Sequence, residues 1–277
     1  MDRILQVGIN AYPSSPLNGC VNDVARWNQV FRAYGFHPDN IRAVVDDRAT
    51  TENIRFRMAW AREGVEPGDT VVFQFSGHGS QVRDRNNDEL ADKMDEIICP
   101  VDLDWGKKMI TDDEISAWAR SFPVGVKLII ILDCCHSGTG TRNPHKLKKK
   151  DPRRRYLPPP LDIALRSHRR ELKEFPHGFV KRKWWVNGNI HYVNEMNHLL
   201  ISGCRSNQYS YDAWFGGTAN GAFTHYLTEL LLKQKETKIK RLHKKLLRRI
   251  RRGGYNQKPQ LEGPAEWLKR PLFQLPE

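Results

Sequence analysis

One short stretch of the chain combines a buried strand with a cluster of reactive side chains. Residues 128–138 read LIIILDCCHSG, so five apolar residues lead directly into an acid, two cysteines and a histidine. An unbroken apolar run that ends in turn residues is typical of a strand buried on both faces of a parallel sheet. Ligands bind at the carboxyl ends of such strands. The cysteines therefore lie either at a reactive site or, as most free cysteines do, in the core as small apolar side chains.

The alternation of elements along the rest of the chain predicts the fold class. Short β-branched or aromatic runs alternate with stretches that repeat apolar residues at helical spacing. Strands separated by helices form parallel sheets with helices on both faces. We therefore expect an α/β protein, a three-layer α/β/α sandwich around a mainly parallel sheet of about six strands. The predicted strands are 3–9, 40–45, 70–75, 128–132, 198–202 and 259–261, and the predicted helices include 20–35, 220–234 and 238–252.

An insertion breaks this pattern and carries much of the basic charge. From Arg142 to Lys183 there are 15 Lys and Arg against 4 Asp and Glu, and residues 233–252 have 11 against 1. Because the whole chain carries +13, the remainder carries −8. We expect one domain over residues 1–277, with a basic, mobile insertion at about 143–197.

Composition excludes several other classes of protein. The chain has 277 residues, of which 39% are hydrophobic, and this suffices for a globular core. No apolar stretch approaches the length of a membrane span, and the apolar segment after Asp2 and Arg3 is too short for a secretory signal. The five cysteines show no structural-zinc spacing and indicate reduced thiols. We expect a cytoplasmic monomer with no membrane partner.

A histidine follows another predicted strand in the same way that the cysteines follow theirs. The strand at 70–75 continues into SGHG, in which two glycines flank His78 and let the backbone approach a ligand closely. If the two strands are neighbours, about 4.8 Å apart, His78 and Cys135 lie together at their carboxyl ends. An imidazole beside a thiol produces the reactive thiolate. The backbone N–H groups of Gly79 and Cys135 would then face a developing oxyanion.

These paired motifs resemble those of caspase-like cysteine proteases. SGHG and DCCHSG each follow an apolar strand in the right order, and His78 precedes Cys135 by 57 residues, near the caspase spacing. The cysteine motif is not the QACRG type of animal caspases. It resembles that of metacaspases and bacterial orthocaspases, peptidase family C14, as do GCVND, MDEIICPVD, LLISGCRSNQYSYDA and NGAFT. The resemblance covers nearly the whole chain outside the insertion and implies the caspase-like fold.

The resemblance implies a catalytic pair and a specificity pocket. Cys135 resembles the nucleophile and His78 the general base. Asp133 and Asp23 resemble the two acids of the S1 pocket, which holds the residue before the scissile bond (P1), and Ser76 is expected to line the same pocket. Two carboxylates would bind Lys or Arg through charge-assisted hydrogen bonds and would repel Asp. The implied function is a cysteine endopeptidase acting on proteins or peptides with Lys or Arg at P1.

The same resemblance bears on calcium, which activates many metacaspases. Asp95, Asp112 and Asp113 resemble their calcium ligands, but Arg142 stands near the position of a further acid. A cation there would weaken a divalent site, so the sequence predicts no required cofactor and leaves calcium open as an activator. The acidic run at 81–94 also offers oxygen ligands, although a solvated loop explains it equally well.

Two other functions fit parts of the sequence. A cysteine phosphatase needs five residues between its cysteine and its arginine, whereas six separate Cys135 from Arg142, and SGHG has no role in that scheme. The basic helix at 238–252 would let a caspase-like scaffold with little protease activity bind nucleic acid or another acidic surface. A solvated helix face explains this charge as well, and no nucleic-acid motif accompanies it, so nucleic acid is not an expected partner.

The basic insertion also offers a substrate within the same chain. Residues 146–155 present several Lys and Arg soon after the strand that precedes Cys135. Caspase-like enzymes are commonly processed at this position. We therefore expect self-cleavage in this loop.

Overall fold

The fold is built around a six-stranded sheet. The computed structural model describes residues 1–83, 94–135, 151–160, 163, 183–186, 189–192, 196–205 and 208–274. The strand order is β14-β11-β7-β3-β1-β2, in which only the edge strand β14 is antiparallel to its neighbour. The predicted, mainly parallel sheet is confirmed. Its strands are β1 (Arg3–Gly8), β2 (Ile41–Val45), β3 (Thr70–Ser76), β7 (Lys127–Asp133), β11 (His198–Ser202) and β14 (Gln260–Glu262).

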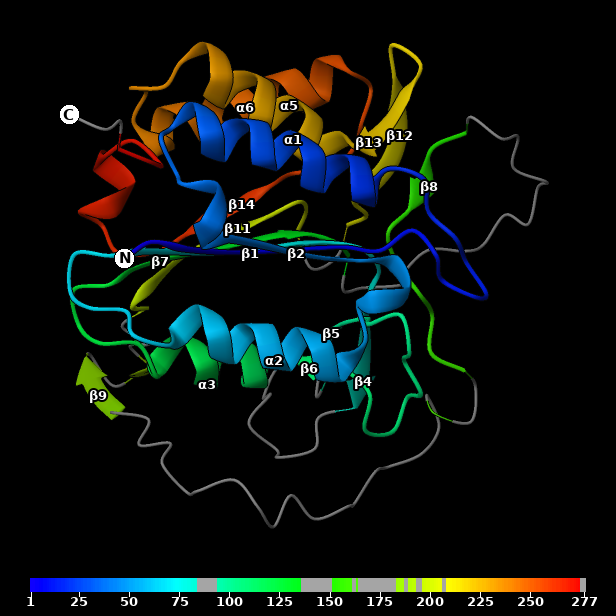
Figure 1. Ribbon diagram of the computed structural model, residues 1–277, viewed down its shortest axis with the longest axis horizontal. Coiled ribbons are helices and arrows are strands. Elements are labelled where there is room, and N and C mark those ends of the chain that lie inside the picture. The colour runs from blue at the N-terminus through cyan, green and yellow to red at the C-terminus, as the bar shows by residue number, and fades with distance from the viewer. Residues whose placement is uncertain are drawn as a thin grey trace.

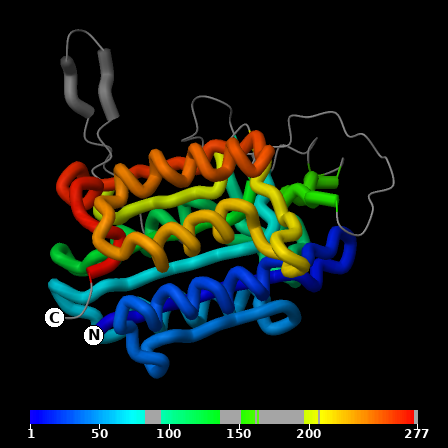
Figure 2. The backbone as a smooth tube through the Cα atoms, turned by 90° about the horizontal axis from the view of Figure 1, so that it is seen from above, coloured from blue at the N-terminus to red at the C-terminus, as the bar shows by residue number. Residues whose placement is uncertain are grey.

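Helices cover both faces of this sheet, which confirms the predicted three-layer sandwich (Figure 1). One face carries α1 (Cys20–Ala33), α5 (Ala222–Lys233) and α6 (Ile239–Arg252), which lie side by side when seen from above (Figure 2). The other face carries α2 (Thr51–Arg62) and α3 (Asp112–Arg120). Short 3₁₀ helices occupy Pro38–Asn40, Asp46–Arg48 and Trp267–Lys269. None of the described helices is both long and apolar enough to cross a membrane.

The apolar run of β7 is unbroken because both faces of the strand are covered. Leu128, Ile130 and Leu132 belong to the hydrophobic core on the α2 and α3 side. Ile129 and Ile131 belong to the core on the opposite side, under α1, α5 and α6. Side chains alternate across a strand, so burial on both faces removes the polar half of the usual pattern.

Two smaller sheets flank the carboxyl ends of the central strands. The first, in the order β4-β5-β6, consists of Gly79–Arg83, Met94–Ile98 and Ile110–Thr111. The sequence predicts a hairpin of residues 97–101 with 108–110, to which the β5–β6 pair corresponds in part, whereas β4 was not predicted. The second contains the unpredicted hairpin of β12 (Tyr211–Phe215) and β13 (Thr218–Gly221). Gly216 and Gly217 join these strands with φ angles of 56° and 90°, the left-handed backbone that a tight hairpin turn needs.

Part of the predicted insertion is held against the second small sheet. β8 (Arg153–Arg154) pairs with β12 and lies at the right of Figure 1. Within residues 151–160, Arg155 is buried among carboxylates. β9 (Lys183–Val186) and β10 (Asn189–Tyr192) form a separate hairpin. The remainder of the insertion, apart from residues 163, 196 and 197, lies outside the described residues, as do Arg142 and residues 84–93.

Candidate active site

The register of two central strands places the candidate histidine and cysteine next to one another in the sheet. β3 pairs with β7 in parallel, and Ser76 lies opposite Asp133 in that pairing. His78 and Cys135 each follow this pair by two residues, at the carboxyl ends of the strands. Both residues are fully buried. The fold therefore places the two residues on which the predicted chemistry depends at the same edge of the sheet, past neighbouring strands.

The ring of His78 is oriented by a backbone carbonyl. Its Nε2 lies 2.7 Å from the carbonyl oxygen of Ser15, and because a carbonyl can only accept, Nε2 carries the hydrogen. Its Nδ1 is buried and has no hydrogen-bond partner among the described residues. Burial lowers the pKa of His78 to about 4, although the Ser15 carbonyl opposes this shift. The imidazole is therefore neutral at neutral pH and holds a free lone pair at Nδ1.

Tyr12 holds the other side of this histidine in place. Its hydroxyl accepts a hydrogen bond from the backbone N–H of His78 at 2.9 Å and donates one to the carbonyl of Cys99 at 2.8 Å. The tyrosine and imidazole ring centroids are 4.5 Å apart. Neither Tyr12 nor Ser15 was predicted from the sequence, because the loop that carries them has no chemical motif of its own.

The two adjacent cysteines occupy different environments. Cys134 is buried in the hydrophobic core on the α2 and α3 side, and burial raises the pKa of its thiol. Cys135 Sγ instead accepts a hydrogen bond from the backbone N–H of Ser210, the residue that directly precedes β12. Both readings of the cysteine pair therefore apply, one to each residue: Cys134 is a core thiol and Cys135 lies at the site.

A single arginine fills the predicted S1 pocket. The Nη2 of Arg155 lies 2.7 Å from Asp23 Oδ2 and 3.0 Å from Asp212 Oδ1, and its Nη1 lies 3.1 Å from Asp133 Oδ2. The side chains of all four residues are at most 1% exposed. Asp23 and Asp133 were predicted, whereas Asp212 was not. The structure thus makes this a pocket of three carboxylates around one guanidinium.

Asp23 and Asp133 are each fixed by further hydrogen bonds. Asp23 Oδ1 accepts from the side chain of Asn220 and from the backbone N–H of Gly221, each at 3.0 Å. Asp133 accepts from the hydroxyl groups of Ser210, at 2.5 Å, and Thr224, at 2.7 Å. These donors stabilise the ionised form of each carboxylate in a buried place.

Charge in the pocket is only partly balanced. Asp212 is fixed by the backbone N–H groups of Asn18 and Gly19, at 2.8 and 3.0 Å. Burial raises the pKa of Asp23 to about 6, and the nearby Arg155 guanidinium limits this rise. Three acids against one guanidinium leave an excess of negative charge, so the pocket strongly favours a cationic occupant.

Two further residues of the family motifs lie at this pocket. A Cβ at Gly221 would collide with Asp133 Oδ2 and with the guanidinium of Arg155, so only glycine fits there. Ser76, predicted to line S1, lies beside Asp133 in the sheet, and its hydroxyl accepts a hydrogen bond from Gln74 Nε2 at 2.9 Å. The polar contacts described for the Arg155 guanidinium are with the three acids and the Asp133 carbonyl.

The backbone around Arg155 crosses the site in an extended conformation. The carbonyl oxygen of Arg155 accepts from the backbone N–H groups of Gly79, at 3.1 Å, and Cys135, at 3.0 Å. These are the two groups predicted to stabilise an oxyanion. The N–H of Arg155 donates to the Ser210 carbonyl at 3.0 Å, and beyond the Arg155–Tyr156 bond the N–H of Leu157 donates to the Gly79 carbonyl at 3.0 Å. Strand addition of this kind is a common way to bind a peptide.

The three predicted calcium ligands lie in one acidic neighbourhood. Asp95 belongs to β5, and Asp112 and Asp113 begin α3, where carboxylates also favour the helix dipole. Burial, together with Asp113, Glu96 and Asp95, raises the pKa of Asp112 to about 7. Within residues 1–83, 94–135 and the other described segments, however, no three Asp, Glu, His or Cys side chains are arranged to hold a metal ion.

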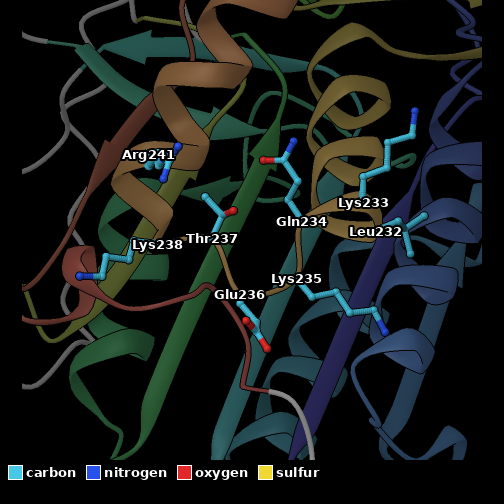
Figure 3. A pocket seen from close by; sticks show the side chains of 8 residues that line it. All are labelled: Leu232, Lys233, Gln234, Lys235, Glu236, Thr237, Lys238 and Arg241. Carbon is cyan, nitrogen blue, oxygen red and sulfur yellow. The ribbon is translucent and has the colours of Figure 1, made fainter.

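A basic hollow lies at the opposite end of α5 from the acidic pocket. Its volume is about 690 Å³, and four of the side chains around it, from Lys233, Lys235, Lys238 and Arg241, are cationic (Figure 3). Neither a thiol nor an imidazole is among its lining residues, so it is not a candidate active site. The apolar side chains of α6, including Leu242, Leu246 and Ile250, are buried in the core, which leaves its cations on a solvated face. The hollow is lined by Leu232, Lys233, Gln234, Lys235, Glu236, Thr237, Lys238 and Arg241.

Comparisons with known proteins identify the family of the chain. The model of the metacaspase, peptidase C14 domain matches residues 2–144. Metacaspase-1 of Yarrowia lipolytica is 32% identical over 94% of this chain, and metacaspase-1 of Meyerozyma guilliermondii is 31% identical over the same share. The chain spans 60% and 68% of the lengths of these two relatives.

Solved structures share the fold along most of the chain. A crystal structure of a protein from Geobacter sulfurreducens superposes with a TM-score of 0.69 and 25% identity, covering 100% of this chain and 99% of that one. Caspase-1 from Spodoptera frugiperda gives a TM-score of 0.56 at 12% identity, covering 95% of this chain and 86% of that one. The second likeness concerns the fold alone.

Proposed function

Because the chain belongs to the metacaspase family of C14 peptidases, we propose that it is a cysteine endopeptidase that cleaves after Arg or Lys and processes itself between Arg155 and Tyr156. One observation carries this proposal. The side chain of Arg155 fills the acidic pocket while its carbonyl oxygen lies between the N–H groups of Gly79 and Cys135. This is the placement that a P1 residue needs before attack on its carbonyl carbon.

The proposed reaction uses the cysteine and histidine as a dyad. His78 Nδ1 takes the proton of the Cys135 thiol, and the sulfur attacks the carbonyl carbon of Arg155. The carbonyl oxygen becomes an oxyanion held by the two backbone N–H groups. When the C–N bond breaks, the imidazolium gives its proton to the amine of Tyr156. A water molecule, deprotonated by His78, then hydrolyses the thioester, releases the new carboxylate of Arg155 and restores the thiol.

The arrangement of the acids favours Arg over Lys at P1. One guanidinium nitrogen contacts both Asp23 and Asp212, and the other contacts Asp133, so the planar fork spans the pocket. A Lys ammonium is a single compact charge, which cannot meet the three acids in the same way. An uncharged side chain of the same shape would leave the carboxylates without a cation.

We predict a strong dependence on charge at P1 in a set of fluorogenic peptides that differ only at that residue. Arg is expected to exceed its uncharged isostere citrulline by on the order of 100-fold in kcat/KM, because desolvated charge pairs contribute a few kcal/mol. Lys should lie between them, and Asp should not be cleaved. Asp133→Asn is the matched control and should reduce the ratio of Arg to citrulline. Preference for Asp, or equal rates for Arg and citrulline, would contradict the proposal.

We also propose that the chemistry needs no metal ion, since the thiol and imidazole supply the nucleophile and the base. Hydrolysis of an Arg peptide is expected to stay within about twofold when EGTA replaces calcium, because a twofold change corresponds to only a few tenths of a kcal/mol. Rates with Asp112→Asn measured in both buffers provide the comparison. A rate that depends on calcium in the parent chain and loses this dependence in Asp112→Asn would instead place an activating cation at the acidic neighbourhood of α3.

A further inference from the structure

A second basic side chain of the bound segment contacts an aromatic ring next to the S1 pocket. The guanidinium carbon of Arg154 lies 4.1 Å from the ring centroid of Tyr209. We infer that Tyr209 forms an S2 subsite for a cation, so that the enzyme prefers a pair of basic residues before the scissile bond. This inference rests on the proposed function, since it takes Arg155 as P1 and Arg154 as P2.

The strand pairing explains why Tyr209 meets P2. Arg154 lies opposite Tyr211 in the antiparallel pair of β8 and β12, and Tyr209 precedes Tyr211 by two residues. Diagonal neighbours of this kind lie about 7–8 Å apart at their backbones, within reach of long and aromatic side chains. Any substrate that adds a strand to β12 in this register therefore brings its P2 side chain to the same ring.

The side chains of the three consecutive arginines contact different parts of the protein. Arg155 enters the acidic pocket, whereas Arg153 Nη1 donates to the Pro16 carbonyl at 2.5 Å. Arg154 is exposed and lies over Tyr209, whose ring is also 6.3 Å from that of Tyr156 on the far side of the scissile bond. The Tyr209 ring thus lies beside both residues that flank P1. A ring face attracts a cation in this position, and an exposed contact of this type is worth a few-fold in binding.

The test compares two peptides that carry Arg at P1 and differ only at P2, with Arg in one and norleucine in the other. They are assayed on the full Arg155→Gln chain, whose own segment no longer supplies a P1 cation. We expect the Arg peptide to exceed the norleucine peptide by about three- to fivefold in kcat/KM. Tyr209→Leu in the same background should bring this ratio close to one, and Tyr209→Phe should largely keep it.

Each outcome separates the inference from the proposed function. Equal rates for the two peptides with Tyr209 present, or an unchanged ratio in Tyr209→Leu, would overturn the S2 assignment while leaving cleavage after Arg intact. An unchanged ratio would attribute the preference to the general negative charge of the site. Failure to cleave either peptide would overturn the proposed function and this inference with it. The ratio within each variant cancels a general loss of active enzyme, and the Phe variant preserves the packing of the ring.

Discussion

Replacing Arg155 with glutamine is expected to stop cleavage after residue 155 and, at the same time, to let the uncleaved chain hydrolyse peptides added in trans. Cleavage after residue 155 should fall on the order of 100-fold or more, because the side chain loses its charge pairs with three buried acids. The same loss of charge pairs should release the segment around residue 155 from the site and leave the site open to an added peptide. A tethered segment competes at an effective concentration in the millimolar range, which a micromolar peptide cannot match.

Two measurements check this pair of effects. The N-terminus of any fragment reports cleavage between Arg155 and Tyr156, and a fluorogenic Arg peptide reports activity in trans. Uncleaved parent protein should show a lag that ends as it processes itself, whereas the Arg155→Gln chain should show none. Arg154→Gln removes the same charge one residue earlier and is the matched control. It should still process itself, more slowly by a few-fold because it loses the contact with Tyr209.

Other outcomes would argue against a bound self-substrate. A new N-terminus at Tyr156 in the Arg155→Gln chain would show that the acidic pocket does not select the cleavage position. An Arg155→Gln chain no more active in trans than the uncleaved parent would show that the segment does not block the site. Arg155→Lys retains a cation and should still process itself, more slowly than the parent but faster than Arg155→Gln, which separates charge from the loss of the arginine itself.

The sequence was sufficient to predict where the two motifs meet, because local patterns fix that place. Two apolar strands each continue into a polar motif, and in a parallel sheet such ends lie at the same edge. The pairing of Ser76 with Asp133 then sets His78 and Cys135 side by side without any further information. The N–H groups predicted to face an oxyanion follow from the same register, since Gly79 and Cys135 both lie just past the paired ends of β3 and β7.

The remaining parts of the site depend on contacts between distant segments. Asp212 lies on an unpredicted hairpin, and although Gly216 and Gly217 signal a turn, nothing local shows that this strand meets Asp23. Ser15 acts through its carbonyl, a group that every residue has. The basic insertion indicated a substrate-like loop, but its charge alone does not distinguish Arg155 from its neighbours. The contacts with the three acids in the folded structure distinguish Arg155 from the neighbouring basic residues.

Alanine at Cys135 is expected to abolish both self-cleavage and peptide hydrolysis, while alanine at Cys134 should leave both. Loss of the nucleophile should lower the rate by on the order of 10⁴-fold or more. The backbone N–H of residue 135 remains in the variant, so the carbonyl of Arg155 keeps its contacts and the chain should stay folded and uncleaved. Activity of Cys134→Ala should remain within a few-fold of the parent, since that thiol lies in the core.

The free energy of unfolding should instead respond to the loss of the Cys134 thiol, which leaves activity intact. This measurement therefore distinguishes a packing role from a chemical role. Cys134→Ala leaves a small cavity among apolar side chains and should lower the free energy of unfolding by about 1 kcal/mol. Denaturant unfolding measures this, with Arg-peptide hydrolysis followed on the same samples. An active Cys135→Ala variant would exclude Cys135 as the nucleophile. A stable but inactive Cys134→Ala variant would transfer that role to Cys134, against the opposite environments of the two thiols, of which only Cys135 faces Ser210 and the bound segment.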